Sequence, residues 1–382
     1  MKKYLFLTLA ALALLTSCIK DEEANQECDI VSAWVEGKEY ENYFYDVTQM
    51  KHENIASTVT EIVFTVKSMI SLPEKLPIQL AVTPGATVVP ASGSEQHFKD
   101  GPVTYTVTSQ DGSWQRQYTV VFREAVKPTY RYGFEEVETI EGMNNNLYHN
   151  FYIFDQAGNR QNVWATGNPG AILIKQNSMP EDQPTYSTEE GYVGRGVCMN
   201  TQDAGMLGRL FGKPIAAGNL FIGQFILDNV LLDALKATQF GLPIDRVPIR
   251  VTGYYKYRPG DTFTNKDMEP VPGRVDEASI YAVFYRNVDK DNKPIFLYGD
   301  NVLSSEYIVR KAEVASLPPT DEWTPFEMFF EGGDADPIVL ASQGYNMTLV
   351  FSSSKDGASF EGAIGSTLYV DEVVVSFEEI TQ

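Results

Sequence analysis

The segment from Val247 to Arg258 carries the side chains of this chain that are best suited to contact a sugar. In an extended strand, successive side chains point to opposite faces. One face of this segment then holds one aromatic ring among polar and charged side chains: Arg250, Thr252, Tyr254, Lys256 and Arg258. A tyrosine ring offers a flat apolar surface to a pyranose, and cations bond hydroxyls or carboxylates. We predict that Arg250, Tyr254 and Lys256 bind carbohydrate, with a solvated face that pairs with carboxylates as the alternative.

A second set of candidate sugar contacts lies in the loop-like stretch from Asn162 to Asn168. Trp164 is the aromatic residue of this stretch, and amide and hydroxyl side chains flank it. We predict that Trp164 stacks on a sugar ring and that Asn168 bonds its hydroxyls. An equally open interpretation is that Trp164 is a plug that closes one end of a β-sandwich.

The residues that could catalyse a reaction give a weaker signal. Hydrolysis of a glycosidic bond needs two carboxylates about 5 Å or about 6.5–9.5 Å apart, and a chain with 51 acidic residues will hold such pairs by chance. The three histidines are scattered, and the chain has no Gly-x-Ser-x-Gly elbow. We therefore expect a protein that binds without cleaving. A glycoside hydrolase or lyase is the first alternative, and a structural or adhesive surface protein is the second.

The elements that would position these residues are strands throughout. In the first third, β-rich segments alternate with Pro-Gly and Asp-Gly turns, which predicts an antiparallel, immunoglobulin-like sandwich over residues 29–126. Residues 123–129 contain Pro128 and no strand signal, so we place the domain boundary there.

Residues 130–382 are again rich in strands and turns, which predicts a larger jelly-roll sandwich and an all-β protein. Asp228–Gln239 is the one predicted helix. The predicted strands are Ile172–Lys175, Leu220–Leu227, Val247–Tyr257, Ser279–Arg286, Ile295–Tyr298, Phe326–Phe330, Met347–Phe351 and Thr367–Phe377.

The N-terminus predicts export. Two lysines precede the apolar run Leu5–Leu15, which is too short to span a bilayer, so residues 1–17 are typical of a signal peptide. Leu-Thr-Ser before Cys18 resembles the lipobox of bacterial lipoproteins, in which the cysteine is acylated. Residues 18–28 then form a lipidated tether, whose lysine and acidic residues resemble a surface-export signal. An ordinary signal peptide and a solvated linker are the alternatives. We predict an outer-membrane lipoprotein exposed at the cell surface.

The charge of the chain limits its partners. The formal net charge is −21, which argues against nucleic acid and against electrostatic docking on anionic lipid. Contact with the membrane is therefore expected through the lipid anchor only. Cys28 and Cys198 are expected to be separate thiols rather than a disulfide.

Four spaced segments carry a resemblance to a known family: 162–170, 214–225, 253–257 and 368–373. In this order they resemble the "putative carbohydrate metabolism domain" of gut-bacterial surface lipoproteins. The resemblance implies a jelly roll similar to carbohydrate-binding modules, behind an immunoglobulin-like domain, and no established reaction. Its implied partners are polysaccharides or oligosaccharides and other surface proteins of glycan utilisation, and it implies no required cofactor.

A structural calcium ion is the one metal that the sequence suggests. Jelly-roll carbohydrate modules commonly hold calcium between their first and last strands, and oxygen ligands suit this ion. The corresponding residues are Glu135 and Asp371. The alternative is that Asp371 only caps the final strand.

Overall fold

The computed structural model describes residues 23–125, 127–155, 157–230 and 233–379. The chain divides into two compact units, Met1–Val126 and Lys127–Gln382, and each is described by itself. The predicted signal peptide and Cys18 lie outside the described residues. No helix among the described residues is long and apolar enough to cross a membrane.

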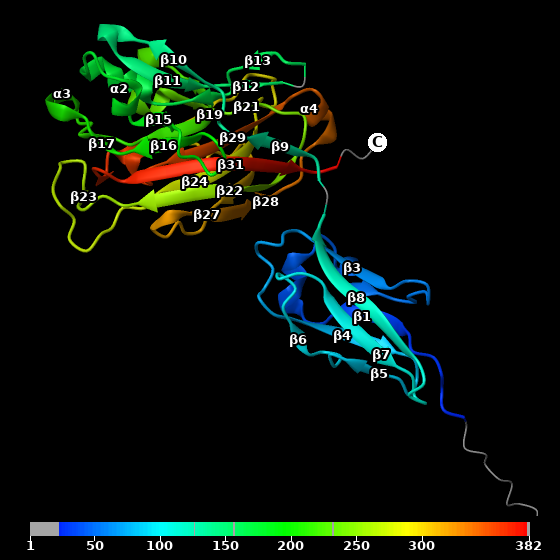
Figure 1. Ribbon diagram of the computed structural model, residues 1–382. Helices are drawn as coiled ribbons and strands as arrows, with labels where there is room; N and C mark the ends of the chain where they lie inside the picture. The colour runs from blue at the N-terminus through cyan, green and yellow to red at the C-terminus, as the bar shows by residue number, and fades with distance from the viewer. Residues whose placement is uncertain (1–22, 126, 156, 231–232, 380–382) are drawn as a thin grey trace, which may run out of the picture. The chain divides into compact units, whose positions relative to one another are not determined.

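The N-terminal unit is a sandwich of two four-stranded sheets (Figure 1). The first sheet runs in the order β2 (Lys51–His52), β1 (Ile30–Val35), β4 (Leu76–Val82) and β6 (Glu95–Gln96). The second runs in the order β3 (Glu61–Val66), β8 (Gln115–Glu124), β7 (Val103–Thr108) and β5 (Thr87–Val89). All pairs are antiparallel except β3 with β8. Alternate residues such as Phe64, Tyr105 and Tyr118 fill the core.

The C-terminal unit is built on two larger sheets. The first sheet has six strands. Five of them lie side by side in the order β15 (Thr185–Thr188), β16 (Gly196–Asn200), β31 (Thr367–Phe377), β22 (Pro248–Arg258) and β27 (Thr320–Phe329). The sixth, β9 (Thr129–Tyr132), pairs with β31. The second sheet has nine strands. Seven of them lie side by side in the order β25 (Leu297–Tyr298), β20 (Thr238–Phe240), β19 (Asn219–Phe225), β29 (Tyr345–Ser352), β24 (Ser279–Arg286), β26 (Ile308–Glu313) and β28 (Glu331–Gly332). The other two are β14 (Trp164–Ala165), which pairs with β19, and β21 (Leu242–Pro243), which pairs with β29. Figure 1 shows β16, β31, β22 and β27 side by side.

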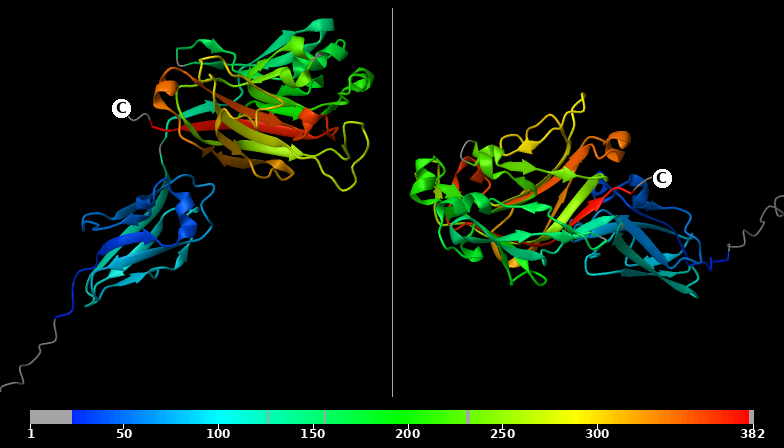
Figure 2. Two further views of the ribbon diagram at one scale, coloured as in Figure 1. Left: turned by 180° about the vertical axis from the view of Figure 1, so that it is seen from behind. Right: turned by 90° about the horizontal axis from the view of Figure 1, so that it is seen from above.

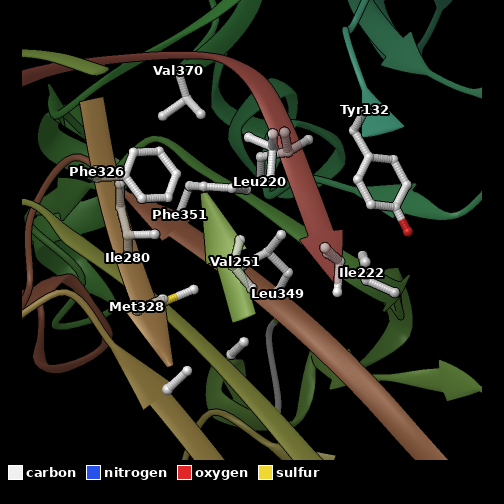
Figure 3. Packing of buried hydrophobic residues seen from close by; sticks show 14 of the residues in the cluster. Tyr132, Leu220, Ile222, Val251, Ile280, Phe326, Met328, Leu349, Phe351 and Val370 are labelled. Atoms are coloured by element: carbon white, nitrogen blue, oxygen red, sulfur yellow. The ribbon is translucent and has the colours of Figure 1, made fainter. Parts of the chain in front are cut away.

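The core of this unit lies between the two sheets. In Figure 3, apolar side chains from both sheets meet in one cluster. The six-stranded sheet contributes Val251, Phe326, Met328 and Val370, and the nine-stranded sheet contributes Leu220, Ile222, Ile280, Leu349 and Phe351. Because strand side chains alternate, the residues between these positions face away from the core. The fold class predicted from the sequence, an immunoglobulin-like sandwich followed by a jelly roll, is confirmed.

The outer face of the nine-stranded sheet is covered by its own chain. Val283 and Tyr285 of β24 belong to a second apolar cluster together with Leu297 and Val302, which lie in the connection from β24 to β26. Strand β24 is therefore buried on both faces, as its apolar sequence predicts.

Short elements complete the unit. The remaining strands form four pairs: β10 (Val137–Glu141) with β11 (Leu147–Phe151), β12 (Ile153–Phe154) with β13 (Arg160–Gln161), β17 (Gln202–Asp203) with β18 (Ile215–Ala216), and β23 (Phe263–Thr264) with β30 (Gly362–Ala363). The α-helices are α2 (Asn168–Ala171), α3 (Gly205–Leu210) and α4 (Pro337–Ala341). Helices α2 and α3 lie at one end of the unit and α4 at the other (Figures 1 and 2).

Two predicted elements are wrong. The predicted strand Ile172–Lys175 is a 3-10 helix over Ile172–Ile174, because the Asn146 side chain binds the carbonyls of residues 172 and 175. The predicted helix Asp228–Gln239 is replaced by two 3-10 helices, Leu227–Asn229 and Ala234–Lys236, and by β20. Pairing of β20 with β19 overrides the local helical pattern.

Candidate functional site

The outer face of the six-stranded sheet carries a row of side chains across five neighbouring strands. The register places Tyr186 of β15 beside Cys198 of β16, then Tyr369 of β31 and Lys256 of β22. Trp323 of β27 completes the row, because the Lys256 ammonium lies over its ring at 4.8 Å. The residues on either side of Cys198 and Tyr369 along their strands belong to the core, so this row points the other way.

Three aromatic rings gather on this face. Tyr192, from the loop between β15 and β16, stacks on Tyr254 with ring centroids 3.7 Å apart and planes 11° apart. Trp323 meets Tyr192 edge to face at 6.3 Å. Tyr192 remains 45% exposed, and its hydrogen bond with Tyr254 raises the pKa of the Tyr254 hydroxyl. The cluster is therefore a partly exposed aromatic surface on a rigid sheet.

The cations of this face differ in whether they have acidic partners. Arg258 pairs with Asp321 at 2.7 Å and Arg195 with Glu189 at 2.7 Å, and Arg131 pairs with Glu372. The predicted alternative of a face that pairs its own charges thus holds for these arginines. Among the described residues, no carboxylate lies within 4.0 Å of the Lys256 ammonium. The ammonium instead makes a cation–π contact with the Trp323 ring.

Two carboxylates hold the loop that carries Tyr192. Asp371 accepts the amide of Val193 at 2.9 Å, and Glu135 accepts the amide of Arg195 at 3.2 Å. Asp371 is fully buried, and burial raises the pKa of its carboxyl to about 6. The two residues therefore fix the loop, and with it the position of Tyr192.

These contacts bear on the predicted calcium ion. Glu135 and Asp371 both reach the loop of residues 191–195, but the oxygens described above accept amide hydrogens. Among the described residues, no group of three or more histidine, cysteine, aspartate or glutamate side chains is placed to hold a metal ion. Calcium stays a prediction, and the loop contacts give both carboxylates a structural role without it.

The cysteines of the described chain are free thiols. Cys28 lies in the core of the N-terminal unit. Cys198 lies within the row, buried beside the hydroxyls of Tyr186 and Tyr369, and its burial raises the pKa of the thiol. This thiol is a packed structural group.

The structure corrects the predicted roles of Trp164 and Asn168. Trp164 is only 3% exposed, and its ring packs against Tyr132 at 5.0 Å and Phe134 at 5.3 Å. Asn168 is fully buried, and its side chain bonds the backbone of Thr185 as both donor and acceptor. Neither side chain can reach a ligand, and the interpretation of Trp164 as a core plug fits its surroundings.

Arg250 also has a structural role. Its guanidinium pairs with Glu327 at 2.6 Å, and both side chains are almost fully buried. Removal of one partner would leave a buried charge uncompensated. Arg250 is thus on the predicted face of β22 but does not join Tyr254 and Lys256 in the exposed cluster.

The sequence interpretation missed Tyr192 and Trp323. The predicted strand began at Phe326, three residues after Trp323, whereas β27 begins at Thr320 and is irregular in register beside Trp323. Tyr192 lies between Gly191 and Gly194, a pattern typical of a hairpin loop. The glycine pair is the signal that could have found Tyr192, and no regular alternation marks Trp323.

The two packed sheets of the C-terminal unit form a jelly-roll domain, and the outer face of its six-stranded sheet carries aromatic and cationic side chains. Residues 133–376 match the family described as "Putative carbohydrate metabolism domain", so the chain belongs to that family and has a carbohydrate-related domain. Residues 44–121 match the family "SGBP, N-terminal".

Two solved structures are similar to this chain. One, from Bacteroides thetaiotaomicron VPI-5482, is 34% identical, covers 94% of this chain and 99% of its own, and has a TM-score of 0.59. The other, from Bacteroides vulgatus ATCC 8482, is 38% identical, covers 66% of this chain and 100% of its own, and has a TM-score of 0.60. Each is described as a "putative glycoside hydrolase". A comparison with curated proteins finds no match.

Proposed function

We propose that the C-terminal unit binds a polysaccharide or oligosaccharide on the outer face of the six-stranded sheet, without cleaving it. The observation that carries the proposal is the partly exposed cluster of Tyr192, Tyr254 and Trp323 beside Lys256. The Tyr192 ring, held by its loop against Tyr254, and the Trp323 ring of β27 offer apolar surface to sugar rings, and the tyrosine hydroxyls and the ammonium offer hydrogen-bond donors. Membership of a carbohydrate-related family supports the same class of ligand.

The surroundings of Asp371 favour binding over hydrolysis at this face. A carboxyl group with a raised pKa is suited to act as a general acid, and Asp371 has such a pKa. However, its side chain is fully buried under the 191–195 loop, where it accepts backbone amides. The Asp371 carboxyl cannot contact a glycosidic oxygen unless the 191–195 loop moves away from it. Because each similar structure is described as a "putative glycoside hydrolase", the binding experiment below also measures hydrolysis.

We further propose that the protein is anchored through lipid on Cys18 and faces outward from the outer membrane. The match of the N-terminal unit to a domain of surface glycan-binding proteins supports this location. Other surface proteins of glycan utilisation are the expected partners. Metabolic labelling with palmitate should mark the wild type but not Cys18→Ser, and protease added to intact cells should digest the anchored protein. Absence of label in the wild type would contradict the anchor.

Affinity electrophoresis tests the binding proposal. The protein without residues 1–18 is run through gels that contain host or plant polysaccharides, and the same mixtures are assayed for new reducing ends. We expect retardation by at least one polymer without new reducing ends. Trp323→Ala and Tyr254→Ala should each weaken it at least tenfold. Trp114→Ala, which alters a 60% exposed tryptophan of the N-terminal unit, is the matched control and should bind as the wild type.

Two other results would change the proposal. New reducing ends would show cleavage and favour the hydrolase or lyase. Absence of retardation and of products with every polymer would contradict carbohydrate binding and favour the structural or adhesive alternative.

A further inference from the structure

We propose that the bound glycan carries an acidic group, a carboxylate or a sulfate, that pairs with Lys256. This inference rests on the proposed function of the face and names the chemical class of its ligand. It depends on how the charges of the face are used, on the neighbours of Lys256 in the row, and on the position of its ammonium group.

Lys256 differs from the arginines of this face in having no acidic partner among the described residues. Each arginine of this face has a carboxylate partner: Arg131, Arg195, Arg250 and Arg258. Lys256 has none among the described residues, although the chain holds 51 acidic residues against 30 basic ones. Lys256 lies within the aromatic cluster and has no acidic partner there, so its ammonium can pair with an anionic group of the ligand.

The neighbours of Lys256 in the row are uncharged side chains. Tyr369 lies opposite Lys256 in the register of β22 and β31, and Trp323 lies under the ammonium. The remaining members of the row are Tyr186 and Cys198, so no carboxylate interrupts it. Within the row, an anionic group beside Lys256 would thus meet uncharged side chains, and Glu190 of the loop between β15 and β16 is an acidic residue that acts on Tyr369 from outside the row.

The ammonium group of Lys256 is held against an aromatic ring. A lysine on a long side chain is usually mobile, but here the Trp323 ring lies 4.8 Å from the Lys256 nitrogen. This contact fixes where the charge lies and leaves N–H donors free, since an ammonium carries three. A sugar ring stacked on the aromatic cluster would bring its own acidic substituent within reach of that charge.

Matched pairs of polymers test the inference directly. Polygalacturonate, alginate and chondroitin sulfate are compared with the same polymers after reduction of their carboxylates or removal of their sulfates. The chain of residues 19–382, with both units present, is used throughout. We expect at least one acidic polymer to retard the protein, and its neutral derivative to bind at least tenfold more weakly. Binding of the acidic form should also fall as salt rises from 50 to 500 mM, because an ion pair in water is screened.

Substitutions locate the effect. Lys256→Met keeps an unbranched stem over Trp323 and removes the charge, so it should lower affinity for the acidic polymer about tenfold and leave the neutral derivative unchanged. Lys256→Arg keeps the positive charge, so it should retain most of the difference in affinity between the acidic polymer and its neutral derivative. Lys290→Met removes the same charge from an exposed turn of the same unit and should have no effect.

The outcomes separate this inference from the proposed function. If only neutral polymers bind, and Trp323→Ala abolishes their binding while Lys256→Met does not, the inference is wrong and the proposed function stands. Equal binding of an acidic polymer and its neutral derivative would also overturn the inference. If no polymer binds at all, the proposed function fails and this inference fails with it.

Discussion

At the scale of single residues, two tryptophans show how the same side chain serves stability or binding. Trp164 is enclosed by Tyr132, Phe134 and Phe351, whereas Trp323 lies on the sheet face beside Tyr192 and Lys256. The sequence could identify Trp164 only as a tryptophan in a loop-like stretch. Burial depends on contacts with residues far away in the chain, so the local pattern could not distinguish a plug from a platform.

Trp164→Phe is expected to lower stability and spare binding. The smaller ring leaves part of the core unfilled, and a loss of about 1–2 kcal/mol in the free energy of unfolding follows from cavity costs of this kind. The indole N–H has no partner in the core, so its removal offsets part of that loss. Urea unfolding and affinity electrophoresis of the same sample measure both effects. A tenfold loss of glycan affinity without loss of stability would contradict the core role.

Asp371 predicts a specific pH dependence of stability. Its folded pKa of about 6 exceeds the ordinary value of 3.8 because burial disfavours the charged form. Between about pH 4 and pH 6 the folded state therefore holds more protons than the unfolded state, and this group's contribution to stability falls as pH rises. Asp371→Asn removes that slope. The variant should gain on the order of 2 kcal/mol relative to wild type between pH 4 and pH 7.

Urea unfolding at several pH values from 4 to 7 measures this difference. Asp155→Asn is a useful comparison, because hydrogen bonds from Asn159 lower the pKa of Asp155 and the expected change has the opposite sign. Parallel pH profiles for wild type and Asp371→Asn would show that burial does not raise the pKa of Asp371.

At the scale of elements, strands with regular alternation could be predicted and the connections between them could not. The alternation in Val247–Arg258 placed Tyr254 and Lys256 on the outer face correctly, because a period of two follows from strand geometry. The predicted helix over 228–239 failed at its C-terminal end because Thr238 and Gln239 pair with Phe225 and Gln224 of the preceding strand β19, and its first part forms two short 3-10 helices instead. The 191–195 loop depends on Glu135 and Asp371, which are distant in sequence.

Gly194→Ala tests the role of this loop. Gly194 has φ +66, and a Cβ there would collide with the carboxylate of Glu135. The variant should lose about 1–2 kcal/mol of stability from backbone strain and bind glycan several-fold more weakly, because Tyr192 shifts on Tyr254. Gly212→Ala is the control, since Gly212 has φ +67 and no neighbour within 4 Å of the added atom. Equal binding by the two variants would contradict a positioning role for the loop.

At the scale of the whole molecule, each unit holds its own apolar core. The core of the N-terminal unit is built on residues from Cys28 to Phe122, and the main core of the C-terminal unit on residues from Tyr132 to Phe377. Short strands and turn signals predicted two sandwiches, because such patterns are local. The exposed cluster could be predicted only in part, since Tyr192, Tyr254 and Trp323 come from three separate segments that the sheet brings together.

Removal of the N-terminal unit is therefore expected to leave binding intact. The cluster and the carboxylates that hold its loop all lie within residues 127–382, and so does the core beneath them. A fragment of residues 127–382 should retain its polysaccharide with an affinity within twofold of the longer chain. Calorimetry should show two unfolding transitions in the longer chain, one of which recurs in the fragment. If the fragment keeps its transition but loses binding, part of the glycan site belongs to the N-terminal unit, and the cluster alone is insufficient.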